Sequence, residues 1–275
     1  MVPAISSGVV VLPKGFRFFV FLFLLSCLVF IKEAVSDVLE DYDIAGDVVF
    51  DGNIRLMMQD KVENAHEVSL VVNLPRYLHD MKEFVLIVDN NPIQQVMRIE
   101  PHRRIEKVGT NIRMERTSPV RVAVLDSSNV WRVVTKKVFV TTPGGCSAPS
   151  GGEALNMNDI GRVLVNLYER RVGAMRIKTK VLHPMDTGLV LDNDGNVIPE
   201  YYIDRMEFSD DSGLIAIIET FAALSANPMV MLDLPDRSQN VRINMSDSKG
   251  YIFRGECRKR WNNGGHCGNE RKYRE

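Results

Sequence analysis

The sequence predicts an all-β protein of two antiparallel β-sandwich domains, joined by a glycine-rich loop and a short helix. Short β-branched runs separated by turn residues recur over residues 37–142, as is typical of a sandwich. Similar runs resume over residues 173–255. Between them, over residues 143–172, lie a glycine-rich stretch and a segment whose apolar residues recur at helical spacing. The pattern therefore predicts two β domains and one connector.

Residues 1–36 have the pattern of a secretory signal peptide. Lys14 and Arg17 precede the apolar run 18–31, and the small residues of Ala34-Val35-Ser36 suit a signal peptidase. The run is shorter than the ~20 apolar residues that span a membrane as a helix. We expect cleavage, export from the cytoplasm and no membrane attachment of the mature chain.

Two alternatives to cleavage remain open for this leader. The apolar run could stay in place as an uncleaved anchor. The stretch Leu24-Leu25-Ser26-Cys27 also resembles a lipidation box, although the apolar run continues past Cys27. Both alternatives would keep the protein attached to a membrane.

The first domain contains five β-rich segments: VVFDG, HEVSLVVNLP, EFVLIVDNNP, NIRME and SPVRVAVLDSSNVWRVVTKKVFV. Apolar and polar residues alternate over 120–124, so one side of that strand is expected to face a core. The segments 89–92 and 126–129 are rich in Asp, Asn and Ser, which favours turns.

The connector contains the stretch TTPGGCSAPSGG at 141–152, in which Cys146 follows Gly144 and Gly145. Glycine has no side-chain bulk, so this stretch is expected to be flexible and sterically open. A helix is predicted over residues ~155–171 from its apolar positions. These are Met157, Ile160, Val163, Leu164 and Leu167.

The second domain is predicted from six strand segments, with hairpin turns at 192–195 and 246–250. The segments are 175–182, 197–208, 213–221, 229–234, 241–245 and 251–254. Residues 256–275 are basic and poor in apolar residues, which predicts a solvated tail. A basic patch for an acidic partner is the alternative for this tail.

Composition and motifs exclude several function classes. A formal net charge of −1 gives no field that favours nucleic acid. The nucleophile elbow, Walker loop, dinucleotide fingerprint and His-Glu-x-x-His motif are all missing from the sequence, which disfavours ordinary hydrolases, kinases and dehydrogenases. The segment 183–186, His-Pro-Met-Asp, is interpreted as a strand end and turn. No catalytic residue, metal ligand or cofactor is predicted.

Three cysteines remain after removal of the leader, namely Cys146, Cys257 and Cys267. Cys257 and Cys267 are close in sequence, and an oxidising compartment favours a disulfide between them. A metal site with His266 is the weaker alternative, because three candidate ligands do not complete a tetrahedral set. Cys146 is then the odd thiol, although it could instead be an incidental linker residue or pair with a tail cysteine.

Basic residues gather between positions 98 and 121, offset by only three glutamates. They are Arg98, Arg103, Arg104, Lys107, Arg113, Arg116 and Arg121. A solvated sheet face accounts for such a set. If several of them converge near Cys146, they would lower the pKa of its thiol and attract an anion.

Two blocks of sequence resemble a known pair of subunits. The first domain, ending in VFVTTPGGC, resembles SoxY, the sulfur-carrier subunit of the periplasmic thiosulfate-oxidising system. The second, with VLHPMDTGLVLDNDGNVIPEYYIDRMEF and ALSANPMVMLDL, resembles SoxZ, which pairs with SoxY. The order resembles the SoxYZ-like fusions that are associated with quinoprotein dehydrogenases.

This resemblance implies a fold and a role. Both subunits are immunoglobulin-like sandwiches, and the two halves would pair within this chain. Cys146 would carry sulfur intermediates covalently, for example as a persulfide, and present them on a flexible loop to partner enzymes. The implied partners are periplasmic sulfur-oxidising enzymes, or a quinoprotein dehydrogenase with a c-type cytochrome. The chain itself would be a carrier and not an enzyme.

The chain departs from the family pattern at the arm. The family arm is a glycine-flanked chain end, whereas GGCSAP here is held at both ends and contains Pro149. Two rival functions therefore stay open. One is a non-covalent binding or assembly module for a periplasmic dehydrogenase. The other is a thiol-dependent enzyme, for which no base or second redox cysteine lies beside Cys146 in sequence.

The leader pattern yields a first prediction, that the exported protein begins at or near Asp37. The small residues before Asp37 suit the peptidase, so the apolar run should be removed on export. Amino-terminal sequencing of the protein from the exported fraction checks this. An intact Met1 or an acylated Cys27 would contradict it.

Overall fold

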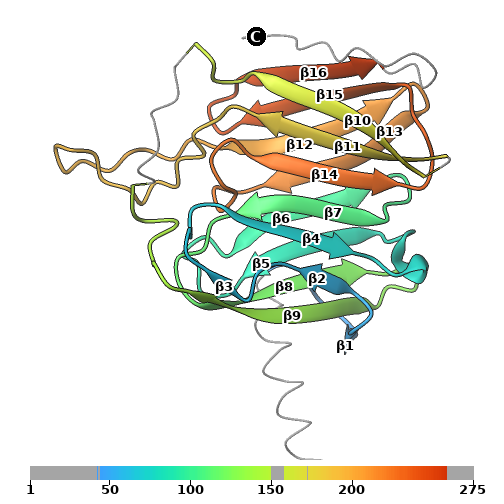
Figure 1. Ribbon diagram of the computed structural model, residues 1–275, viewed down its shortest axis with the longest axis horizontal. Coiled ribbons are helices and arrows are strands. Elements are labelled where there is room, and N and C mark those ends of the chain that lie inside the picture. Colours follow the sequence, from blue (N-terminus) through green and yellow to red (C-terminus); the bar gives the residue numbers. More distant parts are fainter. Residues whose placement is uncertain (1–41, 43, 150–157, 172, 259–275) are drawn as a thin grey trace, which may run out of the picture. The chain divides into compact units, whose positions relative to one another are not determined.

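The computed structural model describes residues 42, 44–149, 158–171 and 173–258, and the residues from Asp47 onward belong to one compact unit (Figure 1). All regular elements of the described part are strands apart from one short 3-10 turn, η1 (Arg76–Leu78). The all-β prediction is confirmed. None of the described residues lies in a helix long and apolar enough to cross a membrane.

Nine strands belong to the first domain. They are β1 (Val48–Phe50), β2 (Arg55–Met57), β3 (Lys61–Val62), β4 (Val68–Asn73), β5 (Glu83–Val88), β6 (Gln95–Pro101), β7 (Lys107–Ile112), β8 (Ser118–Leu125) and β9 (Trp131–Val140). Seven strands belong to the second domain. They are β10 (Val163–Arg171), β11 (Ala174–Val181), β12 (Ile203–Asp210), β13 (Gly213–Thr220), β14 (Met229–Leu234), β15 (Asn240–Asp247) and β16 (Ile252–Arg258).

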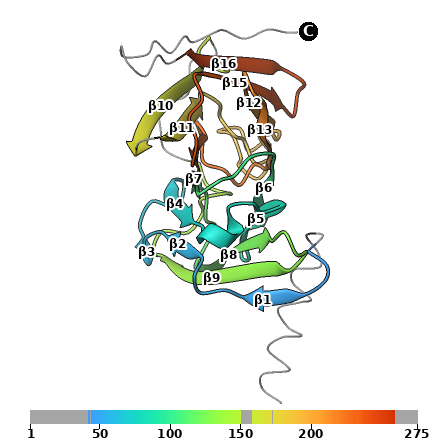
Figure 2. The same ribbon diagram turned by 90° about the vertical axis from the view of Figure 1, so that its right-hand side faces the viewer.

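The strands form two facing sheets, and each sheet contains strands of both domains (Figures 1 and 2). The larger sheet has the order β1-β9-β8-β5-β6-β13-β12-β15-β16, with β3 also on β9, and the smaller has the order β10-β11-β14-β7-β4-β2. Only β1 and β3 pair in parallel, both with β9, among the strands described. Each domain is thus an antiparallel, immunoglobulin-like sandwich whose two layers continue into the other domain.

Two strand pairs join the domains edge to edge. Strand β6 pairs with β13, from Met97 opposite Thr220 to Pro101 opposite Ala216. Strand β7 pairs with β14, from Lys107 opposite Asp233 to Thr110 opposite Val230. Each pair satisfies backbone groups that an isolated domain would leave exposed at a sheet edge. The two domains consequently share one continuous apolar core.

The predicted helix over residues 155–171 is wrong where the structure describes it, because residues 163–171 form strand β10. Val163, Val165 and Leu167 are buried while the residues between them are more exposed, so the apolar period is two. Pairing with β11 and the preference of valine for strands outweigh the helical spacing that Ile160 and Leu164 suggest.

Two further differences concern element boundaries. Strand β6 lies outside the β-rich segments predicted from sequence. The predicted tail begins at residue 256, but β16 continues to Arg258 with Cys257 fully buried. By contrast, the turns at 126–129, 192–195 and 246–250 are confirmed by positive φ angles at Asn129, Gly195 and Gly250.

Several sequence predictions fall outside the described residues. They concern the signal peptide and Cys27 in 1–36, the glycines at 151–152, the start of the predicted helix at 155–157, and the tail beyond Arg258 with His266 and Cys267. These remain predictions.

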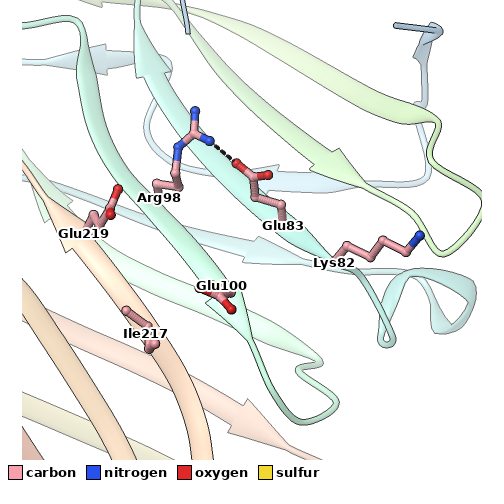
Figure 3. Close-up of a pocket in the computed structure, with 6 residues that line it drawn as sticks. All are labelled: Lys82, Glu83, Arg98, Glu100, Ile217 and Glu219. Carbon is pink, nitrogen blue, oxygen red and sulfur yellow. Dashed lines mark hydrogen bonds and ion pairs between the residues drawn. The ribbon is translucent and has the colours of Figure 1, made fainter. Parts of the chain in front are cut away.

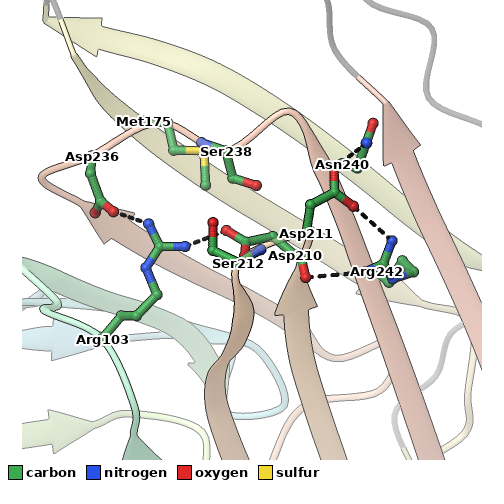
Figure 4. Close-up of polar contacts among 9 residues, drawn as sticks. All are labelled: Arg103, Met175, Asp210, Asp211, Ser212, Asp236, Ser238, Asn240 and Arg242. Atoms are coloured by element: carbon green, nitrogen blue, oxygen red, sulfur yellow. Dashed lines mark hydrogen bonds and ion pairs between the residues drawn. The ribbon is translucent and has the colours of Figure 1, made fainter.

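Ion pairs reinforce the joint between the domains (Figure 4). Arg103, in the loop after β6, binds the carboxylates of Asp210 and Asp236 from the second domain. The side chain of Asp210 is 2% exposed and that of Arg103 is 19% exposed. A carboxylate so buried is stabilised mainly by its partner cation.

Removal of that cation should destabilise the joint. We expect Arg103→Ala to lower the free energy of unfolding by about 2–3 kcal/mol, because Asp210 would keep a buried charge without Arg103. Arg104→Ala is the matched control, since Arg104 and its partner Asp80 are both more than half exposed, and it should cost less than about 0.5 kcal/mol. Urea unfolding of the two variants measures the difference, and equal effects would contradict this account of the joint.

Candidate functional site

Cys146 lies in a turn that follows β9, and its backbone is tightly held. Five consecutive amides, from Gly144 to Ala148, donate hydrogen bonds. Gly144 and Gly145 donate to the carbonyls of Glu115 and Met114, at 2.8 and 3.2 Å. Ala148 donates to the Gly144 carbonyl at 2.9 Å. This segment, residues 144–148, is called the Cys146 loop below.

Glu115 is the main anchor of the Cys146 loop. Its Oε2 accepts hydrogen bonds from the amides of Cys146 and Ser147, at 3.1 and 3.2 Å. Its Oε1 accepts one from the Ser147 hydroxyl at 2.6 Å. Glu115 follows β7 closely, so the end of that strand sets where the carboxylate meets the loop.

Gly145 is needed for this close approach. A Cβ atom at Gly145 would lie 2.2 Å from the Ala65 carbonyl oxygen and 2.5 Å from that of Met114. Both are backbone atoms, which cannot rotate away as a side chain can. The second glycine of the pair therefore allows the loop to pack against the first domain, which is a different role from the flexibility expected from sequence.

A buried cation contacts the same loop. Arg113 is 5% exposed, and its guanidinium donates to the carbonyls of Gly145 and Leu224, at 3.3 and 3.1 Å. It also donates to the carbonyls of Pro184 and Met185. His66 Nδ1 donates to the same Gly145 carbonyl at 3.2 Å. Burial, followed by the charge of Arg113, lowers the pKa of His66.

The second domain closes the site from the other side. Thr187 Oγ1 donates to the Cys146 carbonyl at 2.7 Å. Thr187 belongs to the segment 183–188, which follows β11 after Leu182. The strand end predicted at 183–186 lies at Val181, and Asp186 forms an isolated bridge with Tyr201 in place of a turn. His183 in this segment is fully buried, and its Nε2 lies 3.6 Å from Asp247 Oδ2. Cys146 is thus held by residues of both domains.

The structure differs from the predicted open thiol, because Cys146 is 0% exposed. Burial, reinforced by the charge of Glu115 and opposed by that of Arg113, raises the pKa of the Cys146 thiol to about 12. Of the basic set at 98–121, Arg113 is the one member that acts on the Cys146 thiol. The convergence of several cations, which would have lowered the thiol pKa, does not occur, and burial and Glu115 outweigh this one cation.

Four of the remaining basic residues of that set are occupied elsewhere. Arg98 pairs with Glu83, Arg103 with Asp210 and Asp236, Arg104 with Asp80, and Arg121 with Asp89. The pairs of Arg98, Arg103 and Arg121 are partly buried. They serve the fold, and they do not add positive charge to the site around Cys146.

Cys146 is a free thiol. Cys257 is disulfide-bonded, and its partner lies outside the described residues. The disulfide of Cys257 therefore does not involve Cys146. The predicted bond between Cys257 and Cys267 remains a prediction, because Cys267 also lies outside the described residues.

Two surface hollows are alternative candidates for a site. One of about 210 Å³ crosses β5, β6 and β13, and Figure 3 shows its lining of Lys82, Glu83, Arg98, Glu100, Ile217 and Glu219. Arg98 and Glu83 are paired there, and the lining contains no Ser, Cys or His nucleophile. The other, of about 440 Å³, is lined in part by Glu115, Arg116, Ser147 and Leu189, so it adjoins the Cys146 loop.

Sequence reasoning identified Cys146, Gly144 and Gly145 but missed the residues that hold them. Glu115 and Arg113 appeared only as members of a charged set, and His66 was not singled out. Thr187 lies within the block His-Pro-Met-Asp-Thr-Gly at 183–188. The resemblance of this block to SoxZ was the sequence signal that could have pointed to Thr187. No local pattern connects these positions, which come together through the pairing of distant strands.

The buried thiol should titrate far above its ordinary range. The folded pKa of about 12 exceeds the ordinary value of 9.0, so the thiol stays neutral in the folded protein where an exposed one ionises. The resulting stabilisation is present below pH 9 and is lost as the pH rises toward the folded pKa. Thiolate absorbance of the wild type minus that of Cys146→Ser measures the midpoint. A midpoint at or below pH 9 would contradict the burial of this thiol.

Comparisons with known proteins agree with this architecture. The model of the sulfur oxidation protein SoxY matches residues 42–146, and that of the sulphur oxidation protein SoxZ matches residues 168–258. Together they cover more than half of the chain. No curated protein matches the sequence.

Two solved structures are similar to part of the chain. The sulfur carrier protein SoxY from Chlorobium limicola f thiosulfatophilum is 17% identical, with a TM-score of 0.35, and the match covers 38% of this chain and 98% of that one. A superoxide reductase (neelaredoxin) from Ignicoccus hospitalis is 9% identical, with a TM-score of 0.30, covering 34% of this chain and 94% of that one. On the two family matches, which follow one another along a single chain, the protein belongs to the SoxY/SoxZ sulfur-oxidation carrier family as a SoxY–SoxZ fusion.

Proposed function

We propose that this protein is a periplasmic covalent carrier of sulfur intermediates, with Cys146 as the carrying residue. The observation that carries the proposal is the position of this cysteine. Cys146 is the last residue of the SoxY match and the free thiol of the described residues. A thiol can hold sulfur by forming a sulfur–sulfur bond and can release it by exchange.

The fusion supports an internal carrier pair. The SoxY and SoxZ matches lie in one chain, and strands β6 and β7 of the first pair with β13 and β14 of the second. Linking two partners in one chain gives them a high effective concentration. Thr187 from the second domain and Glu115 from the first both bond the Cys146 loop. The SoxZ half therefore helps to set where the carrier thiol lies.

Partner enzymes would supply the chemistry, and the chain would act without a catalytic residue or cofactor of its own. The proposed partners are periplasmic sulfur-oxidising enzymes, or a quinoprotein dehydrogenase with a c-type cytochrome. The loop is tethered at both ends, unlike the free arm of the family. Since an extended residue spans at most ~3.3–3.6 Å, a loop that goes out and returns has about half the reach of a free end.

A second function is favoured by one observation. The thiol is fully buried and its pKa is raised to about 12, so in this conformation it is a poor nucleophile. A non-covalent binding or assembly module for a periplasmic dehydrogenase would need no reactive thiol. In that case the hollow beside the Cys146 loop, lined by Arg116, Ser147 and Leu189, is the surface available for a partner.

Replacement of the thiol separates the two functions. We expect Cys146→Ser to keep the fold, because serine is nearly isosteric, and to abolish sulfur-dependent activity in the cell. Unreduced mass spectrometry of exported wild-type protein should show sulfur adducts on the peptide that contains Cys146. Ser147→Cys with Cys146→Ser is the matched control, as it moves the thiol by one residue on the same loop. A wild-type thiol that is never modified, together with a fully active Cys146→Ser variant, would favour the binding module.

A further inference from the structure

The Cys146 loop is docked, although a carrier thiol must reach other proteins. Its five amides are bonded, its sulfur-bearing side chain is 0% exposed, and both domains contribute anchors. The loop is also short and bounded by exposed residues, with Pro143 on one side and Pro149 on the other. It can therefore leave as a unit without disturbing the strands.

The anchors of the loop are few and act on its backbone. Glu115 bonds two amides and one hydroxyl, Thr187 bonds the Cys146 carbonyl, and Arg113 with His66 bonds the Gly145 carbonyl. Hydrogen bonds to a charged group are stronger than those between neutral groups. Glu115 is thus the single side chain whose loss would weaken the docked state most.

The docked site has no place for cargo. A side chain with no exposed area has no room for a further sulfur atom or sulfonate while the loop stays in place. Burial and the Glu115 carboxylate both disfavour negative charge at this sulfur, and Arg113 only partly offsets them. An anionic group on Cys146 therefore opposes docking through its volume and through its charge.

We propose that Glu115 latches the loop around the unmodified thiol, and that a group attached to the Cys146 sulfur releases the loop. The inference rests on the carrier function proposed above and specifies when the carrier is closed. The empty carrier keeps its thiol neutral and shielded from adventitious oxidants. The loaded carrier presents its cargo. Because coupling is reciprocal, any change that opens the loop also makes loading easier.

The first test measures how readily the thiol is reached. Purified full-length protein is alkylated with iodoacetamide at pH 8 without reductant, and the peptide that contains Cys146 is followed by mass spectrometry. Glu115→Gln keeps the size of the side chain but removes its charge. The variant should react about tenfold faster than the wild type, the effect of losing roughly one net hydrogen bond from the closed state.

A matched control separates the latch from a change of net charge, and the loading test below separates it from the direct effect of Glu115 on the pKa of the Cys146 thiol. Glu63→Gln removes the same charge from an exposed glutamate of the same domain, and it should react as the wild type does. The urea midpoint of Glu63→Gln should equal that of the wild type, whereas Glu115→Gln should unfold at slightly lower urea, because its closed state loses roughly one net hydrogen bond. A Glu115→Gln rate equal to that of the wild type would overturn the latch. So would a faster rate that rises with urea as steeply as global unfolding does, because the thiol would then react only in the unfolded chain.

The second test loads the thiol. The Cys146 thiolate attacks the sulfenyl sulfur of 2-sulfonatoethyl methanethiosulfonate, a disulfide forms, methanesulfinate leaves, and the thiol proton passes to the buffer. Amides of residues 144–147 should then exchange hydrogen at least about tenfold faster, while those of β8 keep their rates. Unchanged exchange in the adduct would overturn the proposal.

Both tests use purified protein and need no partner. The absence of sulfur adducts in cells would count against the carrier function and leave the latch measurable. If both tests fail but the Cys146 thiol does carry sulfur in cells, the latch proposal is wrong and the carrier function stands.

Discussion

The pairing of β6 with β13 and of β7 with β14 is the interaction on which the rest of the structure depends. It converts two sandwiches into one body with continuous sheets and satisfies strand edges that would otherwise be open. It also sets the site. Arg113 and Glu115 follow β7, and the segment with Thr187 follows β11, which pairs with β14. The register of these strands therefore brings both halves to Cys146.

The chemistry of Cys146 is decided by a competition between burial and charge. Arg113 is a buried cation that by itself would favour a thiolate. Removal of the thiol from water and the neighbouring Glu115 carboxylate act in the opposite direction and prevail. The docked thiol is consequently neutral over the physiological range. Under the proposed carrier function, a reactive thiol and a protected thiol would be two positions of one loop and would not require two different sites.

The fusion places the Cys146 loop between two tethers, where the family arm is a free chain end. A loop tied at both ends reaches less far than a free end, but the second tether allows backbone contacts on both sides of the cysteine. Gly145 fits against the backbone of Ala65 and Met114, and Thr187 reaches the Cys146 carbonyl. Covalent linkage of the two domains keeps these contacts available at any protein concentration. Shorter reach is thus combined with a defined resting position.

The sequence by itself determined the β class, the two-domain order and the turns, and it singled out Cys146 as the candidate carrier residue, because alternation, turn residues and contiguous motifs are local signals. It misplaced β10, where helical and strand periods overlap over a few residues, and it took the glycines beside Cys146 for a sign of an open arm. Only the tertiary structure decided the burial of Cys146 and its raised pKa. The burial depends on a loop anchored by His66, Glu115 and Thr187, which lie far apart in sequence and meet through strand pairing across the domain joint. The raised pKa follows from that burial and from the Glu115 charge.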